Sequence, residues 1–254
     1  MTRTAPIAIG IAGGRPGAGR RTIAINLAAA VAATGRRVGL TGTDPRGPII
    51  PEMLGAAEPR WRDGRLVPVE RYGIQVTALA YLVSEEERSD GRRPSGADLA
   101  DRFAHLVAWD NLDILFVELP SLKEAAALLI QRLELEGTVI VATPQGAQEG
   151  VTEAAVADFG QLGVPILGLI ENLSYYQCRH CGQRNAAEAS GAVPALARRL
   201  GVRYLGEVPI SIALRDCTDE NRPAVACVPK PPEAALFEHM AVTLLAALDE
   251  RAGK

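Results

Sequence analysis

The chain has 254 residues, of which 48% are hydrophobic and 4% aromatic, and its formal net charge is −3. This length suits one large α/β domain or two small ones, and the acidic balance argues against a nucleic-acid partner. No apolar run approaches the roughly 18 residues that span a bilayer, and no signal peptide precedes the first predicted strand, so we expect a cytoplasmic protein without a membrane partner.

The first predicted elements are a strand, a glycine-rich loop and a helix. The apolar run 7–11 is short enough for a buried strand, 23–32 has the composition of a helix, and residues 13–22 between them read Gly-Gly-Arg-Pro-Gly-Ala-Gly-Arg-Arg-Thr. This is the context of a phosphate-binding loop, in which glycines let backbone N–H groups surround a phosphate at a helix N-terminus. The nucleotide-binding positions that we expect in the loop are Gly14, Arg15, Gly17, Gly19, Arg20, Arg21 and Thr22.

Two positions of the loop carry unusual residues. A working loop has lysine at position 20 to reach the outer phosphates, and a hydroxyl at position 21 to bind Mg²⁺. Arg20 can still contact a phosphate, but a guanidinium is never a metal ligand, so Arg21 cannot hold Mg²⁺. Thr22 places a hydroxyl one residue late. We therefore expect weak or absent hydrolysis; the alternative is a glycine-rich turn that binds nothing.

The rest of the chain alternates between strands and helices. Further strands are predicted at 37–40, 114–118, 137–142, 164–170 and 204–208, and helices at 97–107, 124–133, 150–162, 193–200 and 233–250. Runs 67–69 and 74–79 suggest a small antiparallel excursion, and the charged stretch 84–96 suggests a solvated mobile loop. The alternation predicts an α/β fold in one domain, residues 1–254, with a mostly parallel sheet and helices on both faces.

Polar residues follow three of these strands. Asp44 lies in the loop after strand 37–40, Glu118 ends strand 114–118, and Asn172 comes directly after strand 164–170. Ligands of an open α/β sheet bind at the carboxyl ends of its strands. We therefore expect Glu118 and Asn172 to join the nucleotide-binding positions, with Asp44 as the candidate catalytic residue.

The cysteines suggest a metal site. Cys178 and Cys181 form a Cys-x-x-Cys pair in the loop 173–182. Such a pair supplies two of the four thiolates of a zinc or iron–sulfur site. A homodimer can supply the other two across a two-fold axis, or Cys217 and Cys227 can supply them within one chain. The ten-residue spacing of Cys217 and Cys227 is unusual for a metal site, so we expect those two to be free cysteines.

The order of these motifs resembles that of the Mrp/ApbC family, P-loop proteins of the deviant Walker A, SIMIBI class that carry iron–sulfur clusters. The family loop reads G-K-G-G-V-G-K-S-T, and residues 14–22 are its counterpart here. The resemblance covers nearly the whole chain, and its other segments are 42–51, 117–125, 143–145, 171–176, the Cys-x-x-Cys pair, 205–209 and 219–223.

The resemblance implies a [4Fe–4S] cluster bridging two protomers through Cys178 and Cys181, a homodimer, and delivery to apo iron–sulfur client proteins. It also implies a Mg–ATP site, and there the chain departs from the family. Four of the family's lysine, serine and aspartate positions are occupied by Arg15, Arg20, Arg21 and Gly42. Glu118 replaces the Walker B aspartate, residues 122–125 replace G-T-G-D, and Asp44 remains as the residue to orient the attacking water.

These departures argue against ATP and Mg²⁺ as bound cofactors, because phosphoryl transfer depends on positioning and on metal-assisted charge neutralisation. The hypothesis is that Arg20 and Arg21 either fold onto Glu118 and Asp44 or bind an anion without metal. Two alternatives to a carrier with degraded hydrolysis stay open. One is an active ATPase that uses Arg20 and Thr22, and the other is a zinc-bound adaptor that pairs with an active paralogue.

Overall fold

The computed structural model describes residues 5–91, 94–120, 123–178, 181, 183–186 and 189–252. Its main sheet has the order β10-β9-β8-β1-β7-β2-β6-β5, and β11 also pairs with β9. The strands are β1 Ile7–Gly13, β2 Val38–Gly42, β5 Val69–Arg71, β6 Ile74–Ala78, β7 Ile114–Glu118, β8 Gly137–Ala142, β9 Ile166–Gln177, β10 Arg184–Ala186 and β11 Tyr204–Ile210. A separate antiparallel hairpin joins β3 Arg60–Arg62 to β4 Arg65–Val67.

All strand pairs of the main sheet are parallel except those of the edge strands β5 and β10. The longer helices are α1 Arg20–Ala32, α4 Gly96–Leu106, α5 Lys123–Arg132, α7 Val151–Gln161, α8 Ala192–Leu200, α9 Ile212–Asp219 and α10 Glu233–Ala252. The shorter ones are α2 Ile49–Met53, α3 Glu85–Ser89, α6 Pro144–Gln148 and the 3₁₀ turns η1 Leu79–Leu82 and η2 Ala224–Ala226. The predicted α/β class with a mostly parallel sheet is confirmed.

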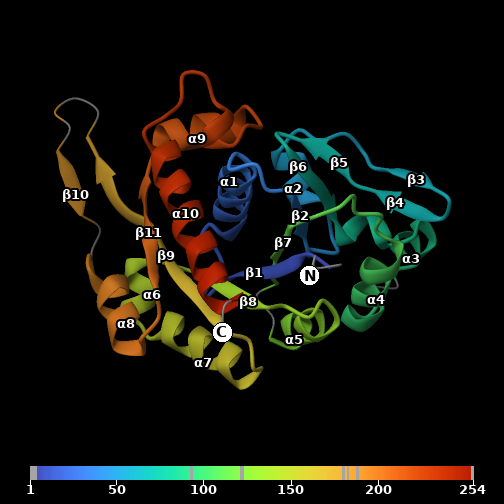
Figure 1. The fold of residues 1–254 in the computed structure, drawn as a ribbon, viewed down its shortest axis with the longest axis horizontal. Helices are drawn as coiled ribbons and strands as arrows, with labels where there is room; N and C mark the ends of the chain where they lie inside the picture. The colour runs from blue at the N-terminus through green and yellow to red at the C-terminus, as the bar shows by residue number, and fades with distance from the viewer. Residues whose placement is uncertain are drawn as a thin grey trace.

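Helices cover both faces of the sheet, as Figure 1 shows, with α1 and α10 on one face and α4, α5, α7 and α8 on the other. Successive side chains of a strand point to opposite faces of the sheet, so each strand contributes to two hydrophobic cores, one on each face. On β1, Ile9 and Ile11 belong to the core beneath α1 and α10, whereas Ala8 and Ala12 belong to the opposite core. Helix α1 is buried from Ile23 to Val31, because it lies between the sheet and α10. The glycine-rich loop is therefore attached to a helix that is buried along most of its length.

Strand β9 is longer than predicted, and this changes the interpretation of loop 173–182. Residues up to Gln177 are still in the strand, because the second half of β9 pairs with β11 and β10. Cys178 thus follows directly on a strand, and Cys181 lies at the end of a β-hairpin. Residues 179, 180 and 182 of that loop lie outside the described part of the chain.

The prediction of a mobile loop at 84–96 is wrong for its first half, where α3 forms. Ser84 and Glu87 make a capping box: the Glu87 amide donates to Ser84 Oγ (3.2 Å), and the Ser84 amide donates to Glu87 Oε2 (2.9 Å). Arg102 of α4 then pairs with the same carboxylate at 2.6 Å. Residues 92 and 93 are not described.

The runs around residue 72 do form an antiparallel pair, β5 and β6, as predicted. They are not an excursion from the sheet, because β6 pairs in parallel with β2. The sequence patterns missed α9 and the β3–β4 hairpin altogether. Within the described residues, no helix has both the length and the apolar character needed to cross a membrane.

Candidate functional site

The glycine-rich loop has the backbone geometry that its glycines allow. Gly17 and Gly19 adopt φ values of 80° and 84°, in the left-handed region that glycine reaches without strain. Gly19 is also the residue before α1, and a Cβ at this position would overlap the side-chain amide of Asn172. Gly14 approaches the first residue of α7, where an added Cβ would lie 3.0 Å from the Val151 carbonyl oxygen. The loop is thus tightly packed at Gly14 and Gly19, whereas an added Cβ at Gly17 would meet nothing within 4 Å.

Arg20 and Arg21 turn toward two carboxylates at the ends of neighbouring strands. Arg20 Nε lies 3.3 Å from Glu118 Oε1, and Arg21 Nη2 lies 3.1 Å from Asp44 Oδ2. A longer contact of 3.9 Å links Arg21 Nε to Glu118 Oε1. These contacts match the first branch of the hypothesis, in which the two arginines fold onto Glu118 and Asp44.

Parallel pairing explains why these groups meet. Glu118 ends β7 and is in register with Ile11 of β1 and Gly42 of β2, so it lies between the strand that leads into the loop and the strand that leads to Asp44. Burial raises the pKa of Glu118, and the charges of Arg20 and Arg21 oppose that rise. The carboxylate therefore depends on the two guanidiniums for its charged form.

Asp44 is held by a third arginine that the sequence analysis did not single out. Arg46 forms a two-pronged contact, with Nε 2.9 Å from Asp44 Oδ1 and Nη2 2.9 Å from Asp44 Oδ2, and its backbone amide also donates to Oδ1. The hydrogen bonds from Arg46 are the largest cause of a lowered pKa at Asp44. With both oxygens engaged, Asp44 is poorly placed to orient a water. The sequence does contain a signal for this contact, because an aspartate in a loop commonly accepts a hydrogen bond from the backbone amide two residues later, and Arg46 is two residues after Asp44.

We call the group formed by Arg20, Arg21, Arg46, Asp44 and Glu118 the arginine–carboxylate cluster. It holds three guanidiniums and two carboxylates, and it contains both loop positions where a P-loop NTPase has lysine and serine or threonine. Each charge has an opposite partner within the cluster. Both carboxylates are thus engaged by arginines at the place where a P-loop NTPase binds phosphate and Mg²⁺, and the three guanidiniums leave the cluster with an excess of positive charge.

The other predicted loop residues lie around this cluster. Asn172 is buried on β9, and its side-chain amide donates to the Ala18 carbonyl at 2.8 Å. Arg15 points away and pairs at 3.4 Å with the exposed Glu149. Thr22 lies in the first turn of α1. A pocket of about 420 Å³ adjoins the outer side of the loop, where Arg15, Pro16 and Gly17 line it.

The cysteine pair lies at the end of the β9–β10 hairpin. The Cys178 amide donates to the Gln183 carbonyl at 2.9 Å, which continues the antiparallel register of the hairpin. Cys178 is partly buried, whereas Cys181 is exposed, and neither is in a disulfide. A hairpin that projects from the sheet edge (Figure 1) can present its thiols to another molecule.

Arg184 of β10 holds this hairpin in place. Its guanidinium lies 3.7 Å from the centre of the Tyr175 ring, and its Nη2 lies 2.7 Å from both carboxylate oxygens of Glu207 on β11. Deeper in the same edge of the sheet, the Tyr204 hydroxyl donates to Glu171 at 2.9 Å. One arginine of β10 therefore contacts both its hairpin partner β9 and the neighbouring strand β11.

A single strand connects the loop to the cysteines. Asn172, which contacts the loop, and Cys178 are six residues apart on and directly after β9. At about 3.3 Å per residue this corresponds to roughly 20 Å of extended chain. Leu173, directly after Asn172, adopts a φ of 59°, and the pairing of β9 with β11 shifts register between Asn172 and Tyr176, so the strand is irregular between the two sites.

The cysteines fit half of a tetrathiolate site. The prediction that Cys217 and Cys227 are free cysteines is wrong: the structure joins them in a disulfide with a Cα–Cα distance of 6.2 Å. They therefore cannot complete a metal site with Cys178 and Cys181 within one chain. Among the described residues, no three or more histidine, cysteine, aspartate or glutamate side chains gather as possible metal ligands. The donor set fits a cluster shared between two chains.

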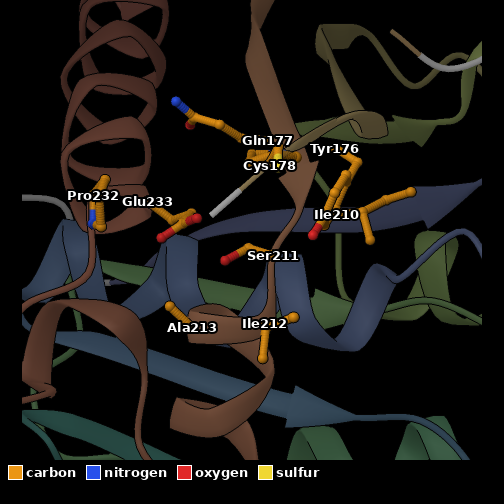
Figure 2. A pocket seen from close by; sticks show the side chains of 10 residues that line it. Tyr176, Gln177, Cys178, Ile210, Ser211, Ile212, Ala213, Pro232 and Glu233 are labelled. Carbon is orange, nitrogen blue, oxygen red and sulfur yellow. The ribbon is translucent and has the colours of Figure 1, made fainter. Parts of the chain in front are cut away.

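A second pocket, of about 280 Å³, opens beside Cys178. Figure 2 shows residues from three elements around it: Cys178 after β9, Ser211 before α9 and Glu233 at the start of α10. Neither Ser211 nor Glu233 belongs to a motif of the sequence. No local pattern could have found them, because they lie more than thirty residues from Cys178 along the chain.

Comparisons with known proteins agree with this arrangement. The family model described as the NUBPL iron-transfer P-loop NTPase, of the ParA group, matches residues 5–245. An iron–sulfur cluster carrier protein of Haemophilus influenzae is 30% identical over 87% of this chain and 61% of its own length. The iron–sulfur cluster transfer protein NUBPL of Dictyostelium discoideum is 29% identical over 95% of this chain and 76% of its own.

Among solved structures, a nucleotide-binding protein of Archaeoglobus fulgidus in complex with ADP is 31% identical. It aligns with a TM-score of 0.73 over 85% of this chain and 86% of its own. The chain spans 61% of the length of the Haemophilus relative. The chain belongs to the NUBPL iron-transfer P-loop NTPases of the ParA group, and with them to the Mrp/ApbC-type iron–sulfur carriers.

Proposed function

We propose that this protein is an iron–sulfur cluster carrier that binds a [4Fe–4S] cluster between two protomers and hydrolyses ATP weakly or not at all. In this proposal residues 1–254 form one P-loop domain, and the loop 173–182 provides the metal ligands. The chain acts in the cytoplasm and delivers its cluster to apo iron–sulfur proteins, without a nucleic-acid or membrane partner. The relatives' descriptions as cluster carrier and cluster transfer proteins support the carrier role.

One contrast in the structure carries the proposal. The loop positions needed for Mg²⁺ and phosphate are engaged in the arginine–carboxylate cluster, whereas the cysteines of the hairpin lie at the edge of the sheet, with Cys178 partly buried and Cys181 exposed. The ADP complex of the Archaeoglobus relative supports the view that glycine-rich loops of this family bind nucleotides. In this chain Arg20 and Arg21 occupy the place of the lysine and hydroxyl that would bind a nucleotide's phosphates and its metal.

Each part of the chain has a definite task in this mechanism. Cys178 and Cys181 supply two thiolates, and the same pair of a second protomer completes the four that a [4Fe–4S] cluster needs. Such a cluster is labile when exposed at an interface, which suits transfer. Arg184 orients the hairpin, and Asn172 connects the hairpin strand to the glycine-rich loop.

Anaerobic reconstitution with iron and sulfide tests the proposal. We expect the reconstituted protein to show the broad visible absorption of an iron–sulfur cluster and to contain four irons for every two chains. Size-exclusion chromatography should show a dimer. Cys178→Ser and Cys181→Ser should each abolish the cluster, whereas Cys217→Ser, remote from the hairpin, should retain it. A chain that assembles no cluster but binds added zinc would favour the alternative of a zinc-bound adaptor. Mg²⁺-dependent phosphate release above background that Arg20→Ala abolishes would favour the active ATPase.

A further inference from the structure

Cys217 and Cys227 form a disulfide that the proposed cluster does not use. Cys217 lies in α9 and Cys227 directly follows η2, and their exposures are 7% and 5%. Disulfides are rare in the cytoplasm, where the proposed function places this chain, and those that form there are usually transient or redox-sensing. Cys178 and Cys181 are not joined in a disulfide. A chain whose proposed cluster ligands are thiolates therefore also carries a second cysteine pair, which is oxidised in the structure.

The disulfide lies within a segment that forms two walls of the pocket beside Cys178. Residues 209–213 lead into α9 and residues 232 and 233 lead into α10, and both groups line this pocket (Figure 2). The bond joins residues 217 and 227 between these two walls along the chain. It therefore restricts the movement of α9 relative to the segment that precedes α10.

Few noncovalent contacts hold α9 in place. Its buried residues are Leu214 and Cys217, and it packs against η2. By contrast, η2 buries Ala224, and the Ala224 amide donates to the side-chain oxygen of Asn26 on α1 at 2.7 Å. Breaking the disulfide should thus loosen α9 while η2 stays anchored to α1.

The disulfide lies just below the surface of the protein. Val228, directly after Cys227, is 86% exposed, and residues 215, 216 and 219 of α9 are exposed. An element with few buried apolar contacts opens locally at low cost in free energy. A small thiol therefore needs only a local opening of α9 to reach one of the two sulfurs.

We propose that Cys217 and Cys227 are a reversible dithiol–disulfide couple that controls the order of α9 and the access of solvent to Cys178. The thiolate of a low-molecular-weight thiol such as glutathione attacks one sulfur and forms a mixed disulfide, and the other cysteine leaves as a thiolate that takes up a proton. A second glutathione thiolate attacks the glutathione sulfur of the mixed disulfide, which yields oxidised glutathione and the second cysteine thiol. The two cysteines gain two electrons and two protons in total, and oxidised glutathione reverses both steps.

The couple regulates the site that contains Cys178. In the disulfide form Cys178 is partly buried, as in the structure, whereas in the dithiol form the wall formed by the start of α9 opens. A cluster assembles in both forms, because Cys217 is not a ligand, but it is lost sooner from the dithiol form. This last consequence rests on the proposed function, whereas the couple itself does not require a cluster.

Equilibration of the folded apo protein in anaerobic glutathione buffers tests the couple. Samples start from the reduced and from the oxidised protein, and they are quenched with acid, alkylated and analysed by mass spectrometry. We expect the pair to pass from disulfide to dithiol as the share of reduced glutathione rises, with the same endpoint from both directions. The inference is overturned if the pair stays oxidised in excess reduced glutathione until the protein is unfolded, or stays reduced in excess oxidised glutathione.

Hydrogen exchange and alkylation of the two forms test the control of α9 and of Cys178. We expect amides 215–219 to exchange at least about tenfold faster in the dithiol form, whereas the Ala224 amide, which Asn26 holds, should not change. Iodoacetamide should modify Cys178 faster in the dithiol form, and Cys181, which is already exposed on the same hairpin, is the matched control. Equal exchange in α9, or equal alkylation of Cys178, would contradict the proposed control.

The double variant Cys217→Ser, Cys227→Ser gives the open form without a reductant. Its α9 amides should exchange like those of the dithiol form, and thermal unfolding followed by circular dichroism checks that it folds. If the double variant does not fold, the parent chain in its two redox forms provides the same comparison without a substitution.

The couple and the proposed function fail in distinguishable ways. If a cluster assembles on Cys178 and Cys181 but the other pair stays oxidised in every glutathione buffer, the inference fails and the proposed function stands. If no cluster assembles but the pair interconverts and α9 loosens on reduction, the proposed function fails and the redox couple stands.

Discussion

Arg20 of the glycine-rich loop lies 3.3 Å from Glu118 at the end of β7, and both side chains are largely buried, with exposures of 14% and 3%. In a P-loop NTPase the first of these positions is a lysine on the phosphates and the second lies beside the metal. Here the two side chains neutralise each other directly. The loop thus keeps the backbone form of a phosphate-binding loop, while the side chain at its lysine position is paired with Glu118 of the same chain.

Restoring the loop should restore nucleotide binding. We expect the combined change Arg20→Lys, Arg21→Ser and Glu118→Asp to bind ATP in a Mg²⁺-dependent way, because it removes the two guanidiniums and returns a hydroxyl for the metal. Isothermal titration calorimetry with and without Mg²⁺ measures this. The unmodified chain should show no Mg²⁺-dependent binding, and productive turnover by it would contradict the proposed blockage.

Removing one partner of the buried pair should destabilise the fold. Glu118→Gln leaves Arg20 and Arg21 without their shared carboxylate, and we expect a loss of about 3 kcal/mol in the free energy of unfolding. Glu149→Gln breaks the exposed pair with Arg15 and should cost less than about 1 kcal/mol. Urea unfolding followed by circular dichroism compares the two. Equal losses would mean that burial of the Arg20–Glu118 pair has no energetic consequence.

The contact between Asp44 and Arg46 should make stability depend on pH. The lowered pKa of Asp44 means that its contribution is present above the ordinary carboxyl pKa and is lost as the pH falls through the lowered value. Arg46→Ala should therefore reduce stability slightly at neutral pH, since Arg46 is exposed and solvent screens the pair, and the difference should vanish in acid. Urea unfolding at several pH values measures it. Arg62→Ala, at an exposed arginine far from the cluster, is the control, and a pH-independent effect of Arg46→Ala would refute the assignment.

Arg184 should govern the order of the cysteine hairpin. Its loss removes both the stacking on Tyr175 and the ion pair with Glu207, so we expect faster amide hydrogen exchange at residues 175–177 in Arg184→Ala. Arg184→Lys keeps the charge but not the planar stacking and should be intermediate. Arg215→Ala, at an exposed arginine on α9, should leave exchange in the hairpin unchanged. Unaltered exchange in Arg184→Ala would show that backbone pairing alone orders the hairpin.

Much of the architecture follows from local patterns. Apolar runs located the central strands, the strand β7 was predicted with its observed bounds, and the alternation with helices indicated the parallel sheet. Glycine spacing located the loop, and the positive φ values of Gly17 and Gly19 show why those positions hold glycine. The mutual approach of Arg20, Arg21, Glu118 and Asp44 was also foreseeable, because carboxyl ends of parallel strands meet at one edge.

The errors have a common cause. The strand β9 was predicted too short because its second half is held by pairing with β10 and β11, and the helix α3 was missed because its capping box and Arg102 outweigh the charge of the segment. Cys217 and Cys227 were expected to be free, and only the packing of α9 beside the segment before α10 brings them together.

Residues within a few positions of one another are enough to specify a turn, a strand or a Cys-x-x-Cys pair, so those features could be predicted from the sequence alone. The placement of Glu233 and Cys178 around one pocket, and the approach of Arg21 and Arg46 to Asp44, depend on how strands and helices distant in the sequence pack. Such contacts are created by chain topology and by the burial of apolar faces, and no spacing of letters along the chain encodes them.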